Sequence, residues 1–305
     1  MDIAGYIRER RAEIDAVLAT VLPTPPECPP AVADAMQYSL TAGGKRLRPI
    51  LCLASADAVG GQRASALPAA CGIELIHTYS LIHDDLPAMD NDTMRRGRPT
   101  LHVVAGEGMA ILAGDGLLTE AFALMAREPR TTDPDVIARK LRVVEVIASA
   151  AGAVGMVGGQ ALDLASAGPA PDNRVMPPLD AGALQTMHAK KTGALIRAAA
   201  TAGAIMGGGD ETQIAALDRA AAEFGLAFQI VDDILDVEGA SADLGKTAGK
   251  DAAAGKPTYP ALYGLERSKA MAAECLERAE ATLRAAGLSD SAVPGIGDWI
   301  VRRRN

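Results

Sequence analysis

The chain has 305 residues, 49% hydrophobic and 22% charged, which excludes an intrinsically disordered protein. Its net charge of −8 argues against binding to nucleic acid or to an anionic membrane surface. Aromatic residues make up only 3% and the four cysteines form no Cys-x-x-Cys pair, so a large β-sheet, a disulfide framework and a zinc site are not indicated. No signal peptide is visible in residues 1–13 and the uncharged run 146–162 is short for a membrane span, so we expect a cytoplasmic protein without membrane insertion.

Apolar residues recur at three- and four-residue spacing along almost the whole chain, which predicts a succession of helices. In chain order the predicted helices are 2–21, 31–42, 49–60, 64–86, 106–127, 133–166, 180–207, 210–237, 257–286 and 289–303. Joints rich in proline or glycine separate several of them, and none is biased enough to be a domain linker. We therefore predict an all-α fold in a single domain.

The stretch TAGGKRLRP at 41–49 predicts a helix end, a glycine turn and a new helix with Pro49 near its first position. Lys45, Arg46 and Arg48 then lie at a helix N-terminus, where the helix dipole disfavours positive charge. An anion held by the exposed amides and these side chains would reverse that cost. A solvent-facing basic turn is the alternative that this motif leaves open.

A first carboxylate cluster closes the predicted helix 64–86, with Asp84 and Asp85 at the end where the dipole disfavours anions. Pro87 disfavours helical geometry in the residue before it, so the chain leaves the helix there. We expect Asp90 to return from the following loop toward Asp84. His77 lies seven residues before Asp84 on almost the same helix face, although a lone histidine is more often structural.

A second carboxylate cluster, QIVDDILD at 229–236, is predicted to end another apolar helix. Asp232 and Asp236 are about 40° apart around such a helix, with Asp233 near them and Gln229 one turn earlier. A single cluster of this kind is usually a solvated helix end. Six carboxylates facing one space would repel one another, and hard divalent cations such as Mg²⁺ would neutralise them. Mg²⁺ usually completes its shell with phosphate oxygens, so the implied ligand is a diphosphate.

Cations accompany these clusters: Arg95, Arg96 and Arg98 follow the first, Lys190 and Lys191 precede the second, and Lys246, Lys250 and Lys256 follow it. Arginine suits bidentate contact with phosphate. The alternative for each is a solvated surface charge, and for Arg98 and Lys250 we favour that alternative.

Together these motifs resemble those of the trans-isoprenyl diphosphate synthases, and within that family the bacterial farnesyl diphosphate synthases. The resemblance rests on GGKRLRP at 43–49, HTYSLIHDDLPAMDND at 77–92, MRRGRPT at 94–100, GGQALDL at 158–164, KTGALIRAA at 191–199, FGLAFQIVDDILDV at 224–237 and LGKTAGKDAAAGKPTYPAL at 244–262. It implies an isoprenoid synthase-type helical bundle around a central cavity, formed by one polyprenyl synthetase domain over residues 1–305. It also implies a homodimer, with the two aspartate clusters facing each other across the cavity mouth.

The same resemblance assigns roles to individual residues. Three Mg²⁺ ions, the number that also balances six carboxylates, would be bound by Asp84, Asp85, Asp90, Asp232, Asp236 and, less clearly, Asp233. Isopentenyl diphosphate would be held by Lys45, Arg48, His77 and Arg96, and the allylic diphosphate by Arg95, Lys191, Lys246 and Lys256. Catalysis would further involve Thr192 and Gln229 beside the carbocation, with Gln160 and Asp163 supporting the site. The basic residues Arg302, Arg303 and Arg304 would either close over the site or form a solvated tail.

The implied activity is Mg²⁺-assisted ionisation of dimethylallyl or geranyl diphosphate, attack by isopentenyl diphosphate and loss of a proton, giving farnesyl diphosphate. Tyr79 and Ser80 lie five and four residues before Asp84, roughly 6–8 Å deeper along the helix. In the resembling family a bulky aromatic at the Tyr79 position is the floor that stops growth at farnesyl. Packing of Tyr79 between helices, with the floor elsewhere, is the alternative.

Three other functions stay open at this point. A geranylgeranyl diphosphate synthase would share the reaction and differ in product length. A terpene cyclase would not need the isopentenyl diphosphate site at GGKRLRP, His77 and Arg96. A non-catalytic partner subunit would be expected to lose at least one aspartate cluster, whereas both are intact here.

Overall fold

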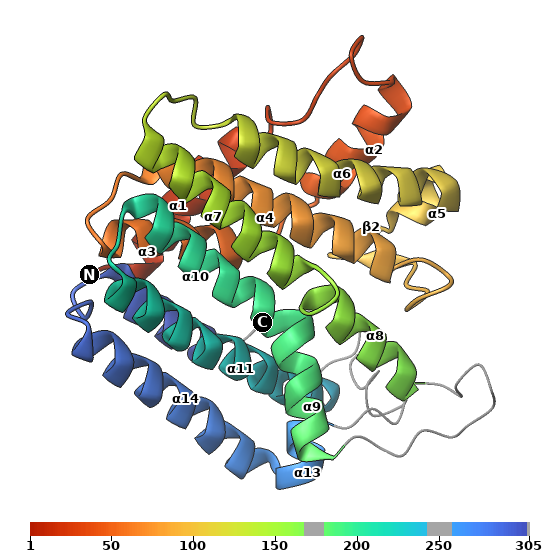
Figure 1. Ribbon diagram of the computed structural model, residues 1–305. Coiled ribbons are helices and arrows are strands. Elements are labelled where there is room, and N and C mark those ends of the chain that lie inside the picture. Colours follow the sequence, from red (N-terminus) through yellow and green to blue (C-terminus); the bar gives the residue numbers. More distant parts are fainter. Residues whose placement is uncertain (168–179, 243–257, 304–305) are drawn as a thin grey trace. The chain divides into compact units, whose positions relative to one another are not determined.

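The computed structural model describes residues 1–167, 180–242 and 258–303. Helices account for almost all of the regular structure in these ranges, and the one sheet found there is a two-stranded hairpin (Figure 1). The predicted all-α class is therefore confirmed. The chain divides into two compact units, which we call the first unit (Met1–Glu145 with Ala202–Gly209) and the second unit (Val146–Thr201 with Asp210–Asn305). The single domain over residues 1–305 and the central cavity stay predictions.

The first unit is built around one long buried helix. Its elements are α1 (Ile3–Leu18), α2 (Pro30–Leu40), α3 (Leu47–Ala58), α4 (Arg63–Asp84), β1 (Met94–Arg95), β2 (Arg98–Pro99), α5 (Leu101–Ala105), α6 (Glu107–Arg127) and most of α7 (Pro134–Ala151). Helix α4 packs against α3 and α6 and is buried on most sides, with Ile73, Leu75 and Ile76 fully enclosed (Figure 1). Small residues allow close packing, since a Cβ on Gly72 would lie 2.9 Å from Met125 Cγ of α6. A rigid α4 fixes every side chain on its final turns.

The second unit is centred on a 32-residue helix. Its elements are α8 (Met156–Ala167), α9 (Ala181–His188), the π-helical turn η1 (Ala189–Gly193), the start of α10 (Ala194–Gly207), α11 (Glu211–Ala242), α13 (Tyr259–Tyr263), α14 (Leu265–Ala285) and α15 (Ala292–Arg302). Helix α11 packs along α14 and α15 (Figure 1). Its buried face includes Phe224, Ile230 and Ile234. The second aspartate cluster lies on this helix.

The observed helices follow the predicted ranges, with breaks that apolar periodicity did not reveal. Glycines with positive φ separate α5 from α6 at Gly106 and α13 from α14 at Gly264. The predicted helix 133–166 is interrupted between Ala151 and Met156. The hairpin β1–β2 was not predicted; Arg96 and Gly97 both have positive φ, as a tight two-residue hairpin turn requires.

Candidate active site

The first aspartate cluster (Asp84, Asp85, Asp90) lies at the end of α4, as predicted. The helix ends at Asp84, three residues before Pro87. The following loop then folds back, because the amide of Asp90 donates a 2.8 Å hydrogen bond to the carbonyl of Asp84. Asp84 is half-buried and Asp90 is exposed. The expected return of Asp90 toward Asp84 is thus present in the backbone.

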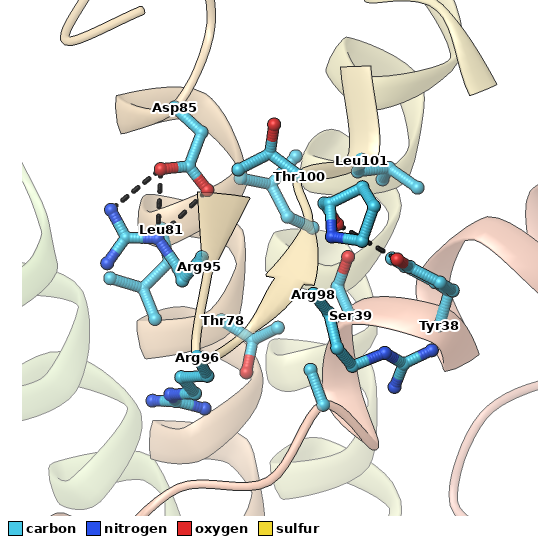
Figure 2. A pocket seen from close by; sticks show the side chains of 13 residues that line it. Tyr38, Ser39, Thr78, Leu81, Asp85, Arg95, Arg96, Arg98, Thr100 and Leu101 are labelled. Carbon is cyan, nitrogen blue, oxygen red and sulfur yellow. Dashed lines mark hydrogen bonds and ion pairs between the residues drawn. The ribbon is translucent and has the colours of Figure 1, made fainter. Parts of the chain in front are cut away.

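Asp85 differs from its two neighbours because an arginine of the hairpin binds it. Its side chain is 5% exposed, and Arg95 donates to it from Nε at 2.9 Å and from Nη2 at 2.7 Å (Figure 2). Burial raises the pKa of Asp85, and Arg95 opposes that increase. Such a bidentate pair is among the stronger ion-pair geometries. Asp85, which was predicted to bind a metal ion, and Arg95, which was predicted to bind the allylic diphosphate, therefore bind each other in this structure.

A small pocket of about 40 Å³ lies beside this pair. It is lined by residues of α2, α4 and the hairpin, among them Tyr38, Thr78 and Arg98 (Figure 2). The guanidinium of Arg98 stacks over the Tyr38 ring at 4.2 Å, and the Tyr38 hydroxyl donates to the Pro99 carbonyl at 2.9 Å. The volume suits about one water molecule and no prenyl chain. Arg98 is thus half-buried and packs on an aromatic ring, whereas the sequence favoured a solvated surface charge.

The predicted basic turn contains one arginine that faces inward. Arg46 has φ +53° and is 5% exposed. It pairs with Glu74 at 2.7 Å and with Asp15 at 2.9 Å, and donates to the Leu40 carbonyl at 2.8 Å. The sequence predicted three cations that could bind an anion here. Arg46 is not one of them, because its left-handed backbone turns the side chain into the core, so Lys45 and Arg48 stay as the candidates. Lys45 and Arg48 are half-buried.

Arg96, on the hairpin turn, lies against the glycine turn that precedes Lys45. Its Nη1 donates to the carbonyl of Gly43, and a Cβ on Gly44 would lie 2.7 Å from the same nitrogen. Burial and the nearby Arg46 and Arg95 lower the pKa of Arg96. The two glycines therefore make room for a guanidinium.

His77, one of the residues predicted to bind isopentenyl diphosphate, lies within the field of this arginine group. Burial, followed by the charges of Arg48, Arg96 and Arg95, lowers the pKa of His77 well below 6.5. An imidazole in this setting is neutral at pH 7. The positive field that suppresses its protonation is the field that would attract a diphosphate.

The two predicted chain-length residues lie on α4, one turn before Asp84. The Tyr79 ring is buried at 7% exposure, and burial together with the charge of Asp84 raises its pKa. The Ser80 hydroxyl donates to the His77 carbonyl at 2.9 Å and so bonds within its own helix. Of these two residues, Tyr79 has the large buried side chain that the floor prediction requires.

In the second unit, the π-helical turn η1 carries Lys191 and Thr192. Lys191 donates to the buried carboxylate of Asp163 at 2.6 Å, and α8 approaches so closely that a Cβ on Gly159 would lie 2.6 Å from the Lys191 Cα. Both amide atoms of Gln160 are buried without a hydrogen-bond partner among the described residues. Asp163 and Lys191 therefore form an ion pair, Gln160 lies on the same helix as Asp163, and Thr192, the residue after Lys191, is half-buried.

The second aspartate cluster (Asp232, Asp233, Asp236) lies within α11 and does not end it. The helix continues to Ala242, beyond the predicted end at 237, and runs through Gly239 without a break. Asp233 is 5% exposed and accepts a 2.9 Å hydrogen bond from the Tyr259 amide. Asp232 and Asp236, like Gln229, are half-buried. Asp233 thus faces the core, and its expected position beside the other two on one face is corrected.

The C-terminal arginine Arg303 binds Asp232. The Nη2 atom lies 2.6 Å from the Asp232 carboxylate and 2.8 Å from the Phe228 carbonyl, and the guanidinium stacks over the Phe228 ring at 3.9 Å. Its side chain is only 4% exposed. Of the two alternatives for the basic C-terminus, this contact favours closure over the aspartate cluster. Lys246, Lys256 and Arg304, the other basic residues predicted near the site, lie outside the described residues.

The donor atoms of both clusters suit Mg²⁺. All are carboxylate oxygens, and Mg²⁺ typically takes one or two carboxylates and completes its shell with water and phosphate oxygens. Among the described residues no group of three or more His, Cys, Asp or Glu side chains forms a ready-made metal cage.

Comparison with known proteins places the chain in a family. Residues 29–286 match the polyprenyl synthetase family. The chain is 44% identical over 303 residues to the farnesyl diphosphate synthase of Geobacillus stearothermophilus, covering 99% of this chain and 98% of that protein. The chain belongs to the polyprenyl synthetase family. The resemblance seen in the sequence is thereby confirmed, and the family uses isopentenyl and allylic diphosphates.

Relatives carry names for more than one product. The chain is 46% identical over 307 residues to the chloroplastic geranylgeranyl pyrophosphate synthase 3 of Arabidopsis thaliana, covering 100% of this chain and 82% of that protein. An FPP/GFPP synthase from Zymomonas mobilis has a similar structure, with a TM-score of 0.84, 35% identity and coverage of 98% and 99% of the two chains. The family is therefore established for this chain, whereas its relatives carry names for products of different length.

The structure draws attention to one residue that the sequence motifs had not singled out. His83 lies between Tyr79 and Asp84, and its imidazole contacts both the Tyr79 ring and helix α6. Its neighbour Gly114 on α6 had no visible signal beyond being an isolated glycine within a helical pattern, which often marks close packing.

Proposed function

We propose that this family member is a farnesyl diphosphate synthase, which condenses isopentenyl diphosphate with dimethylallyl and then geranyl diphosphate. The observation that carries the proposal is the buried aromatic ring of Tyr79, one turn before Asp84 on the rigid helix α4. A fixed aromatic ring at that depth would block further growth of the prenyl chain.

In this proposal the isopentenyl diphosphate is bound by Lys45, Arg48, His77 and Arg96. Burial is the main cause of the low pKa of His77, and the charges of Arg48, Arg96 and Arg95 add to it, so these arginines lie close enough to the neutral ring to share one anion with it. A diphosphate there would relieve the repulsion among the arginines. The neutral imidazole is left able to donate one hydrogen bond and accept another.

The allylic diphosphate is assigned to Arg95 and Lys191, with Lys246 and Lys256. Arg95 and Lys191 are already oriented by Asp85 and Asp163, at 2.7 Å and 2.6 Å. Charges held in place before the substrate binds stabilise the leaving diphosphate without further reorganisation. Thr192 and Gln229 would supply oxygen atoms toward the carbocation, and apolar surroundings would keep water from it.

Mg²⁺, proposed at three ions per site, would supply positive charge to the leaving diphosphate when bound. Asp84, Asp90, Asp232 and Asp236 are the proposed ligands. Asp85 and Asp233 act differently in this proposal, since Arg95 and the Tyr259 amide occupy their carboxylates. They would hold the hairpin and α13 in place beside the ligands.

A geranylgeranyl diphosphate synthase is the second candidate, because a relative with that name is as similar as the farnesyl enzyme. The two candidates share every residue role above except the position of the floor. They differ in whether a product five carbons longer than farnesyl accumulates.

We also propose a cytoplasmic homodimer. Helices α5 and α6 expose Val103, Val104, Ile111 and Leu112, each at least 43% exposed, and exposed apolar side chains gathered on neighbouring helices are typical of a subunit interface. Helix α6 and the stretch Pro134–Ser166 are long and apolar enough to span a membrane, but the turn between Ala151 and Met156 interrupts the second. Sedimentation analysis, with Leu112→Glu expected to give monomers, tests the dimer.

The test of the function uses purified protein, Mg²⁺, isopentenyl diphosphate and, separately, dimethylallyl, geranyl and farnesyl diphosphate, with products weighed by mass spectrometry. Farnesyl diphosphate from the first two starters and little turnover of the third would support the proposal. Geranylgeranyl diphosphate as main product would favour the second candidate. A folded protein that condenses no starter would favour a cyclase or a non-catalytic partner subunit.

A further inference from the structure

His83 occupies the last turn of α4, between the proposed floor residue and the first aspartate. Its imidazole meets the Tyr79 ring in a T-shaped arrangement, with the ring centroids 5.7 Å apart and the planes at 80°. The two residues are four apart and therefore share one helix face. Because edge-to-face contact depends on orientation, the imidazole restricts the positions open to the Tyr79 ring.

The other side of the imidazole rests on helix α6. A Cβ on the buried Gly114 would lie 2.6 Å from His83 Cδ2 and 2.9 Å from Cε1, so only glycine leaves room for the ring. Nε2 lies 3.2 Å from the Ile111 carbonyl oxygen, which can only accept, so Nε2 carries the hydrogen. Asp115 is farther away, at 3.9 Å. The imidazole is thus fixed by a ring, a backbone surface and a hydrogen bond.

We propose that His83 is a positioning residue for product length: it wedges between α6 and Tyr79 and so holds the floor at a fixed depth below Asp84. The inference rests on the proposed function, because it concerns where the growing chain stops. Removing the ring would leave Tyr79 free to turn away from its present position, so that it would no longer stop the prenyl chain at one depth. Filling the Gly114 position would displace the imidazole and disturb the same contact.

Two substitutions separate the ring from the hydrogen bond. His83→Phe keeps an aromatic ring against Tyr79 and loses the donor to Ile111, whereas His83→Gln keeps an amide donor and loses the ring. With Mg²⁺, isopentenyl and geranyl diphosphate, we expect His83→Gln to raise the geranylgeranyl share of product several-fold. We expect His83→Phe to keep farnesyl as the main product, even if its melting temperature falls.

Gly114→Ala tests the α6 side, and Gly108→Ala on the same helix is its matched control, because a Cβ on Gly108 meets nothing within 4 Å. We expect Gly114→Ala to lower the farnesyl share and Gly108→Ala to leave it unchanged. The double variant His83→Ala/Gly114→Ala should lose less stability than the sum of the single changes, since the clashing ring is gone.

The outcomes distinguish this inference from the function on which it rests. A wild type that forms no prenyl product overturns the proposed function and the inference with it. An active wild type with the same product spectrum in His83→Gln, or an equal change in His83→Phe, overturns the inference alone and leaves His83 a packing residue. If Gly114→Ala does not fold, the comparison of His83→Gln with His83→Phe still tests the inference.

Discussion

The two aspartate clusters look alike in sequence and are used differently in the fold. The first ends a helix, and a loop returns Asp90 to Asp84. The second lies inside α11, where the helix alone sets the spacing of its carboxylates. In both clusters the second aspartate is buried and engaged, Asp85 by Arg95 and Asp233 by the Tyr259 amide. The comparison teaches that, within a repeated aspartate motif, the second carboxylate is buried and bound by the protein while its neighbours stay partly exposed.

The largest expected effect separates these two kinds of carboxylate. Asp84→Asn and Asp232→Asn should each lower kcat by about a thousand-fold, because a charge that stabilises the leaving diphosphate is lost. Asp233→Asn should retain far more activity, because its amide oxygen still accepts from Tyr259. Steady-state rates at saturating Mg²⁺ measure this. Equal losses of kcat in Asp232→Asn and Asp233→Asn would contradict the proposed distinction between the two kinds of carboxylate.

Removing the partner of Asp85 should cost stability as well as activity. Arg95→Ala leaves a carboxylate of 5% exposure without its bidentate donor, and we expect a loss of about 2 kcal/mol in the free energy of unfolding. Urea denaturation measures the loss. Arg98→Ala on the same hairpin is the control, because its guanidinium contacts the Tyr38 ring and no carboxylate is left unpaired there. A variant as stable as the control would show that the pair contributes nothing.

The low pKa of His77 predicts how the stability of the first unit depends on pH. The unfolded chain takes up a proton near pH 6.5 and the folded imidazole does not, so stability is full above that pH and falls as pH decreases. The slope contributed by one such group is at most about 1.4 kcal/mol per pH unit. His77→Gln should flatten the fall in stability between about pH 7 and 5. An unchanged profile would mean that His77 is protonated in the folded protein.

The smallest effect concerns the C-terminal contact of the second cluster. Arg303→Ala removes a cation from Asp232, so Mn²⁺ added without substrate should bind a few-fold more tightly. Calorimetry or the paramagnetic signal of free Mn²⁺ would report this. Arg302→Ala is the matched control, because Arg302 pairs with Asp298 at 2.6 Å instead. Identical Mn²⁺ binding in both variants would leave Arg303 as a purely structural contact.

Local patterns predicted the all-α class, most of the helices and the return of Asp90 toward Asp84. The apolar period located the helices, and Pro87 predicted where α4 ends and the loop begins. The inward turn of Arg46 was not predictable, because it depends on φ +53° and on Glu74, 28 residues away. The contact between Arg303 and Asp232 spans 71 residues. Contacts between distant segments depend on packing, which composition and spacing do not record.

The wedge at His83 shows the same limit on a finer scale. A histidine before two aspartates and an isolated glycine on another helix carry no joint signal in one sequence. Only the packing of α4 on α6 shows that the imidazole needs the absence of a Cβ at Gly114. The family resemblance singled out Tyr79 as the proposed floor, whereas the proposed role of His83 depends on a contact that no motif records.

The most direct test of the account is the product spectrum of wild type and Tyr79→Ala, measured side by side with Mg²⁺, isopentenyl diphosphate and geranyl diphosphate. The account predicts farnesyl diphosphate from the wild type and geranylgeranyl or longer diphosphates from the variant. Farnesyl diphosphate as sole product of an active Tyr79→Ala protein, or geranylgeranyl diphosphate from the wild type, would contradict it.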